Sequence, residues 1–246
     1  MSVLRKGADL VLVSHGVRGP SAPASMRAHG ELVALLEATG RFNRIRWGYL
    51  TCEPHLKDVV AEVESATVMI LPMLMSDGHF SKKVIPEILR LDGAVSLRDN
   101  GQQVIQCRPL GLSAKMTSLM SEYALTHCRQ HGSVAGNTSV VVIGHGSPND
   151  DASRLAMSMH VAQMRRNKEF KDVHEAYLEE APGLPDVLRG VSGQALVIGY
   201  FANHGLHATE DVARLIRQSG SSAHYLGPVG ALAAISDVVM DCVDGN

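Results

Sequence analysis

Several residue types and patterns are scarce in this chain of 246 residues. Its four cysteines are scattered and form no CxxC pair, which argues against a thiolate metal cluster or a redox dithiol and favours a reducing cytoplasm. No apolar stretch reaches the ~18–20 residues that span a bilayer. The start, MSVLRKGADLVLV, leads into a His-Gly turn without a signal-peptide cleavage site. We therefore expect a cytoplasmic protein with no membrane partner.

Aromatic residues and net charge are also low, at 4% of the chain and −2. Binding to nucleic acid is not expected, because it needs a basic surface and aromatic platforms. The segment GHGSPN has Asn149 where a dinucleotide fingerprint has its third glycine, and neither a P-loop nor a G-x-S-x-G motif occurs. Histidine phosphatases carry Arg before His-Gly, whereas Ser14 and Gly144 stand here. These absences exclude four common enzyme classes.

What the chain does contain is one unit written twice. Apolar runs end on His-Gly at His15 and again at His145, an offset of 130 (15 to 145). The segment GYLTCEPHLKDVV at 48–60 aligns with AYLEEAPGLPDVL at 176–188, so that Tyr49 matches Tyr177. Each half then continues with another apolar run, a glycine-containing loop and a helical pattern. This repetition indicates an internal duplication.

The order of the elements predicts the fold class. The runs at 10–13 and 140–143 are continuous and aliphatic, which is typical of strands buried on both faces. Strands that alternate with helices at this spacing indicate right-handed βαβ units and a parallel sheet. We predict an α/β protein of two similar doubly wound parallel-sheet domains, residues 1–130 and 138–246, joined by the polar stretch between them.

Histidines are the candidate functional residues. Ligands of such sheets bind beyond the carboxyl ends of the strands, and we expect four histidines there, in one site between the domains: His15, His79, His145 and His207. A lone histidine at a strand end is more often structural, but the repetition favours function. His207 precedes a helix, whose positive end favours a neutral, metal-binding imidazole. The alignment places His79 opposite Leu206, one residue out of register with His207.

Charged residues near these histidines complete the predicted site. Glu179 follows a strand of the second half, and two imidazoles with one carboxylate suit a divalent metal and leave positions open for substrate. The equivalent residue of the first half is Thr51. Arg18, Lys82 and Arg154 are candidates for binding the carboxylates of a substrate. The alternative for each of these charges is a solvated surface role.

Four segments, in this order and duplicated, carry a family resemblance: VSHGVRG, IGHGSPN, AYLEEAP and GLHATEDV. With them the chain resembles the class II tetrapyrrole chelatases, namely the sirohydrochlorin cobaltochelatase and ferrochelatase group in its long, two-domain form. The resemblance implies metal ligands at His145, Glu179 and His207 in the second half and at His15 and His79 in the first. Members of the family differ in which half holds the working site.

The resemblance also implies a reaction. It predicts a lyase that inserts Co²⁺ or Fe²⁺ into sirohydrochlorin or a related tetrapyrrole, in cobalamin or sirohaem (porphyrin-type) biosynthesis. The divalent metal, with Ni²⁺ as a further candidate, is a substrate, and no organic cofactor is expected. His15 or His79 is the candidate general base for the pyrrole protons. We expect a monomer or a weak homodimer. The alternatives are a non-catalytic metal- or tetrapyrrole-binding protein and a metal-dependent hydrolase.

Overall fold

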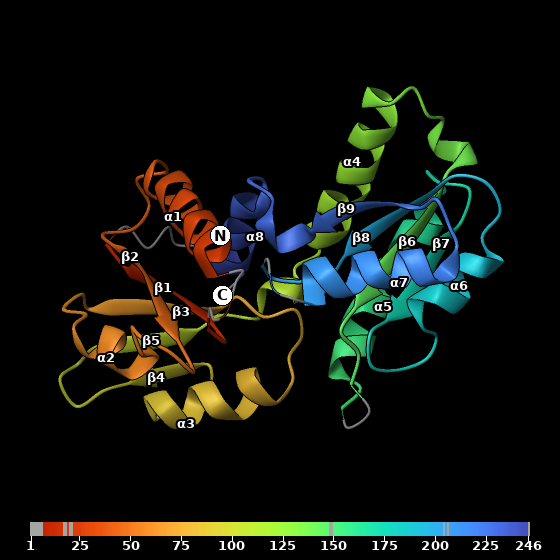
Figure 1. Cartoon of the computed structure of the whole chain (residues 1–246). Helices are drawn as coiled ribbons and strands as arrows, with labels where there is room; N and C mark the ends of the chain where they lie inside the picture. Colours follow the sequence, from red (N-terminus) through yellow and green to blue (C-terminus); the bar gives the residue numbers. More distant parts are fainter. Residues whose placement is uncertain are drawn as a thin grey trace. The chain divides into compact units, whose positions relative to one another are not determined.

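The computed structural model describes residues 7–16, 19, 22–147, 150–203, 205 and 207–245, without the side chains of His207 and Thr209. The chain forms two compact units (Figure 1). Unit 1 holds the described residues up to Ser113 together with those from Ala233 onward, and unit 2 spans Ala114–Leu232. Each unit has its own sheet and core and is described by itself.

The sheet of unit 1 has the strand order β2-β1-β3-β5-β4. Its strands are β1 (Asp9–Ser14), β2 (Ile45–Tyr49), β3 (Thr67–Pro72), β4 (Val95–Leu97) and β5 (Gln103–Gln106). All neighbours run parallel except β4, which is antiparallel to β5. The helices of this unit are α1 (Ala22–Glu37), α2 (Leu56–Ala61), α3 (Ile85–Leu89), which follows the π-helical segment η1 (Phe80–Val84), and α8 (Ile235–Asp244), with a 3₁₀ turn at Leu110–Leu112. Every residue of β1 is buried, as its aliphatic sequence predicts.

Unit 2 repeats this plan with the strand order β7-β6-β8-β9, all parallel. Its strands are β6 (Ser139–Gly144), β7 (Val173–Tyr177), β8 (Ala195–Gly199) and β9 (His224–Pro228). Its helices are α4 (Lys115–Gln130), α5 (Ala152–Asn167), α6 (Leu184–Gly190) and α7 (Val212–Ser219), which follows the π-helical segment η4 (His207–Asp211), with 3₁₀ turns at Ala135–Asn137 and Val229–Ala231. The predicted fold class, two similar parallel-sheet α/β units, is confirmed.

The two compact units do not follow the order of the sequence at two helices, and the division predicted at 130 and 138 stays a prediction. Helix α4 follows the sheet of unit 1 in sequence but belongs to unit 2, where Thr117 Oγ1 lies 2.8 Å from His160 Nδ1. Helix α8 follows the sheet of unit 2 but belongs to unit 1, where the carboxylate of Asp244 accepts two hydrogen bonds from Arg41. Each unit is therefore completed by a helix from the other half of the sequence.

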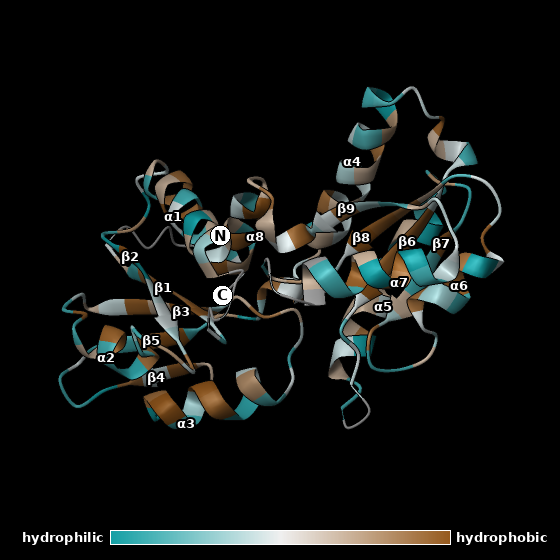
Figure 2. Ribbon diagram, viewed as in Figure 1, coloured by the Kyte–Doolittle hydropathy of each residue, from teal (hydrophilic) through white to brown (hydrophobic). Residues whose placement is uncertain are grey.

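A separate apolar core stabilises each unit. In unit 1 the side chains of β1 and β3, such as Val11 and Ile70, pack against Leu56 of α2 and Ile85 of α3. Burying an aliphatic side chain of this size contributes about 1.5–3 kcal/mol. In Figure 2 the strand β8 is largely brown, whereas α7 carries teal and white segments. No helix among the described residues is both long and apolar enough to cross a membrane.

Candidate metal centre

The loop after β6 presents His145 at the carboxyl end of the central strand of unit 2. The strand ends at Gly144, and Gly146 then turns the chain with φ +72°, a left-handed conformation that favours glycine. A Cβ at Gly146 would lie 2.8 Å from Glu180 Cγ, so a larger residue would displace the Glu180 side chain. The carbonyl of His145 accepts a hydrogen bond of 3.0 Å from the backbone N–H of Glu179. This bond fixes the two residues side by side.

The side chains of His145 and Glu179 also face one another. His145 Nε2 lies 3.7 Å from Glu179 Oε1, and both side chains are about half exposed. His145 Nδ1 lies 3.0 Å from the carbonyl oxygen of Gly146. A carbonyl only accepts, so Nδ1 carries a proton and donates it. In the tautomer with that single proton, Nε2 keeps its lone pair. In this tautomer His145 Nε2 and Glu179 Oε1 are two electron-pair donors, and their separation of 3.7 Å is too long for a hydrogen bond.

Glu180, which the sequence analysis did not single out, orders this loop. Its Oε1 accepts a hydrogen bond of 3.3 Å from the backbone N–H of Ser147. Arg154, predicted to bind substrate, lies with Nε 3.8 Å from Glu180 Oε2 and donates a hydrogen bond of 2.6 Å to Asp151. That hydrogen bond raises the pKa of Arg154. The guanidinium thus pairs with Asp151 and with Glu180, the acid that holds the His145 loop. The two adjacent glutamates of AYLEEAP are the sequence signal from which Glu180 could have been found.

His207 begins η4, which follows the carboxyl end of β8. Strand β8 is the neighbour of β6 in the sheet. Its backbone is held near β9, because the hydroxyl of Tyr225 donates to the carbonyl of Ala208. Burial raises the pKa of Tyr225, so this hydroxyl keeps its proton. The side chain of His207 lies outside the described part of the chain. Within that part, no three His, Cys, Asp or Glu side chains surround a common point that would suit a metal ion.

Unit 1 builds a related but poorer arrangement at His15. The backbone N–H of Thr51 donates to the carbonyl of His15 at 3.0 Å, the bond that Glu179 makes in unit 2. The Thr51 hydroxyl donates to the same carbonyl at 2.8 Å. Thr51 therefore turns its only polar group toward the backbone. No carboxylate takes the position of Glu179 in this unit.

The position of His207 is also changed in unit 1, where Phe80 occupies it. Met73 and Tyr200 make the same backbone hydrogen bond, to the carbonyls of the central strands β1 and β6, at 2.7 Å. They are 127 positions apart (73 to 200), as are the first residues of η1 and η4, Phe80 and His207. The offset is unchanged across the loop, so no gap intervenes. His79 accordingly matches residue 206, as predicted.

The Phe80 ring contacts both histidines of unit 1. The ring centroids of His15 and Phe80 are 5.0 Å apart with the planes at 82°, and those of His79 and Phe80 are 5.7 Å apart at 70°. Of the two predicted substrate-binding residues of this unit, Lys82 has its Nζ 3.6 Å from Asp77 Oδ2 and is largely exposed. Arg18 lies outside the described residues. The structure thus joins His15 and His79 through an aromatic ring.

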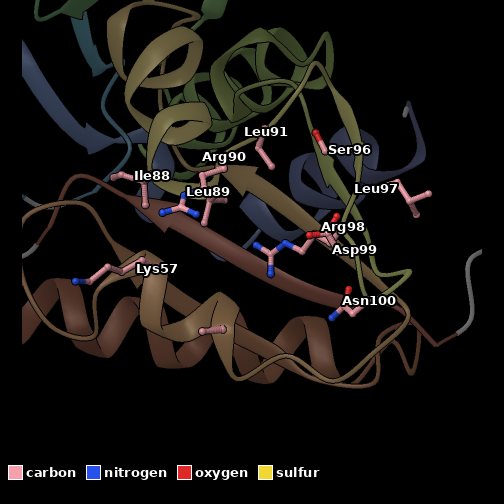
Figure 3. Close-up of a pocket in the computed structure, with 11 residues that line it drawn as sticks. Lys57, Ile88, Leu89, Arg90, Leu91, Ser96, Leu97, Arg98, Asp99 and Asn100 are labelled. Atoms are coloured by element: carbon pink, nitrogen blue, oxygen red, sulfur yellow. The ribbon is translucent and has the colours of Figure 1, made fainter.

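A hollow elsewhere in unit 1 has no part in this arrangement. It has a volume of about 660 Å³ and is lined by Lys57, by the end of α3 at Arg90 and by the β4–β5 connection at Arg98, Asp99 and Asn100 (Figure 3). The connection leads into the amino end of β5, whereas His15 follows the carboxyl end of β1. None of the residues that line this hollow was predicted as a site residue.

Comparison with known proteins defines the class. The sequence profile of the CbiX family matches residues 9–126 and 139–245. The chain therefore belongs to the CbiX family. Over 94% of its length it is 25% identical to a protein of Halobacterium salinarum named as a probable sirohydrochlorin cobaltochelatase, and the match covers 89% of that protein.

Solved structures share the fold. A multi-domain protein from Deinococcus radiodurans, described as structurally similar to chelatases, superposes with a TM-score of 0.79 at 24% identity over 96% of this chain, which spans only 54% of that larger protein. CbiX, the terminal enzyme of sirohaem biosynthesis in denitrifying bacteria, gives 0.78 at 21% identity, covering 98% of this chain and 99% of that one. SirB from Bacillus subtilis, solved with Fe³⁺, gives 0.78 at 17%, covering 97% and 94%. The predicted family and two-unit architecture are confirmed.

Proposed function

We propose that this protein is a cytoplasmic chelatase that inserts Co²⁺ or Fe²⁺ into sirohydrochlorin, or a related tetrapyrrole, on the route to cobalamin or sirohaem. The observation that carries the proposal is the pair formed by His145 Nε2 and Glu179 Oε1, 3.7 Å apart at the carboxyl edge of the sheet of unit 2. The relatives support it, since one is named a cobaltochelatase and SirB was solved with iron and with cobalt.

The chemistry of the pair suits a divalent metal substrate. Metal–nitrogen and metal–oxygen bonds of about 2.0–2.2 Å place two ligands of one tetrahedral ion roughly 3.3 Å apart. A small rotation of either side chain would bring the 3.7 Å between His145 Nε2 and Glu179 Oε1 to that separation. The imidazole can offer a lone pair to the ion, and the carboxylate an oxygen. We assign His207, which starts η4 at the neighbouring strand end, as the third ligand. Three ligands leave positions open, so the ion can be released into the macrocycle.

We assign the working metal site to unit 2, because unit 1 has no ligating side chain at two of the three matching positions. Thr51 takes the position of Glu179, and Phe80 that of His207. Metal insertion requires that two pyrrole N–H protons leave the ring. We propose the exposed imidazole of His15 as their acceptor, with His79 as the alternative.

An anaerobic insertion assay tests the proposal. The visible spectrum of sirohydrochlorin is followed with Co²⁺, Fe²⁺ and Ni²⁺ in turn, for the wild type and for His145→Ala and Glu179→Gln. We expect insertion by the wild type and a loss of roughly 100-fold for His145→Ala, since a ligand contributes at least as much as its outer-shell partners. His174→Ala, a histidine on β7 of the same unit but before its carboxyl end, is the matched control and should insert at the wild-type rate.

Two results would count against the proposal. Wild-type rates in His145→Ala would show that the metal site lies elsewhere. A wild type that binds sirohydrochlorin but inserts none of the three metals above the uncatalysed rate would support the alternative, a non-catalytic tetrapyrrole-binding protein.

A further inference from the structure

Phe80 is an aromatic residue with no role in the metal chemistry assigned above. It is 38% exposed, and it is the one aromatic residue among the exposed large hydrophobic side chains of the described chain. It starts η1, just beyond the carboxyl end of β3, at the edge of the sheet where α/β folds bind ligands. An exposed ring at this edge of a chain with few aromatics needs a physical explanation.

The surroundings of Phe80 are not those of a metal site. The constant offset between η1 and η4 places it where unit 2 has His207, so an apolar ring replaces a nitrogen ligand. Thr51, which replaces Glu179, directs its hydroxyl to a backbone carbonyl. His15 is the one residue of the three that keeps a ligating side chain, and its ring lies in edge contact with Phe80. A cation held by His15 would therefore lie against an apolar neighbour.

The same contacts give Phe80 a defined orientation. The imidazoles of His15 and His79 pack against it at steep angles, 82° and 70°, and hold an otherwise half-exposed ring from two directions. Edge-to-face contacts of this kind are favourable beyond the area that they bury. A pre-oriented ring loses little conformational entropy when a ligand docks on it.

We propose that Phe80 is a contact for the flat conjugated ring of the tetrapyrrole, so that unit 1 takes part in recognising the organic substrate. This inference rests on the proposed function for the identity of the ligand. Stacking on a planar conjugated system needs an aromatic face and not merely apolar volume. The duplicated position would thus have diverged from a ligand of the metal in one half to a contact of the organic substrate in the other.

The test measures affinity without turnover. Metal-free sirohydrochlorin is titrated into the full chain and its binding is followed by fluorescence, for wild type, Phe80→Ala, Phe80→Leu and Phe80→Trp. We expect roughly tenfold weaker binding for both the alanine and the leucine variants and wild-type binding for tryptophan, since stacking on one aromatic side chain contributes about 1–3 kcal/mol. Leu97→Ala removes an exposed apolar side chain of the same unit outside the site and should bind as the wild type does. Fluorescence of Trp47 reports whether unit 1 stays folded.

Each other outcome has a definite meaning. Binding within twofold of the wild type for Phe80→Ala overturns the inference, and full binding by Phe80→Leu overturns the aromatic role in favour of simple apolar contact. A wild type that binds sirohydrochlorin through Phe80 but inserts no metal supports this inference while refuting the proposed function. Insertion by the wild type, with unchanged binding by all Phe80 variants, refutes only the inference.

Discussion

Lowering the pH from 7 to 4 is expected to destabilise unit 1 through one buried side chain, His29. This residue of α1 is 7% exposed, and its Nδ1 lies 2.9 Å from the Tyr49 hydroxyl. Its ring stacks on Trp47 with 3.7 Å between centroids and 15° between planes. Burial lowers the pKa of His29 from 6.5 to about 4, because the charged imidazolium loses its hydration inside the unit. The native state therefore keeps the ring neutral.

The sign of the effect follows from proton linkage. Between pH 4 and 6.5 the unfolded chain binds a proton at His29 and the native state does not, so the free energy of unfolding rises with pH across this window. The contribution is fully present above pH 6.5 and is lost as the pH falls toward 4. A pKa difference of this size amounts to about 3 kcal/mol between pH 7 and pH 4. With a urea dependence of about 1–3 kcal/mol per molar, the unfolding midpoint should fall by at least roughly 1 M.

Trp47 makes the measurement specific to unit 1, since it is the single tryptophan of the chain and contacts His29 directly. Urea unfolding is followed by its fluorescence at pH 7, 5.5 and 4, for the wild type and for His29→Gln, which cannot titrate. The variant starts from a lower stability because its packing changes, so the slopes against pH are compared and not the absolute values. Equal losses in the wild type and in the variant would refute the assignment to His29.

Two further predictions concern glycines. Gly146→Ala should weaken Co²⁺ binding roughly tenfold in calorimetry, because its Cβ meets Glu180 and its φ of +72° is left-handed. The control is Gly190→Ala, whose Cβ meets nothing within 4 Å. Equal affinity for Co²⁺ in the two variants would contradict the loop geometry. Gly111→Ala and Gly230→Ala place a Cβ 2.2 and 2.3 Å from a backbone carbonyl oxygen of the same unit. Each should lower the stability of its unit by at least about 2 kcal/mol, and unchanged melting of either variant would show that these close approaches are not structural.

Much of the fold could be predicted because strands buried on both faces consist of continuous aliphatic residues, a pattern that is visible in the local sequence. The aliphatic runs 10–13 and 140–143 form strands buried on both faces, and the repeated order of elements gives two parallel sheets. The exchange of α4 and α8 could not be predicted. The buried stripe of α4, with Met116 and Met120, shows that this helix covers a sheet, but helical periodicity does not say which of two similar sheets it covers.

Part of the candidate site could also be predicted from the sequence, namely which residues lie at the strand ends. The partners of the individual side chains could not. His145 and Glu179 meet because neighbouring parallel strands end at one edge, which the strand order alone implies. Arg154 carried no signal that it pairs with acids, since a basic residue on a helix reads the same whether it binds substrate or a neighbour. Glu180 was overlooked because Glu179 and Glu180 are identical neighbours in one loop, and the sequence does not say which of them faces His145. Only coordinates show which carboxylate faces the metal gap and which faces the loop.

The divergence of the two units is the feature that links these observations. Duplication first yields two equal copies, and the proposed insertion of one metal ion into one macrocycle needs only one set of ligands. Unit 2 has the imidazole–carboxylate pair, and Glu180 holds the loop that carries its histidine. Unit 1 replaces the carboxylate by a threonine turned inward and one imidazole by a phenylalanine turned outward. Neither Thr51 nor Phe80 offers a side chain that would bind an ion, and Phe80 also presents an apolar aromatic surface. The proposed change from binding a cation to contacting a conjugated ring therefore accounts for both replacements.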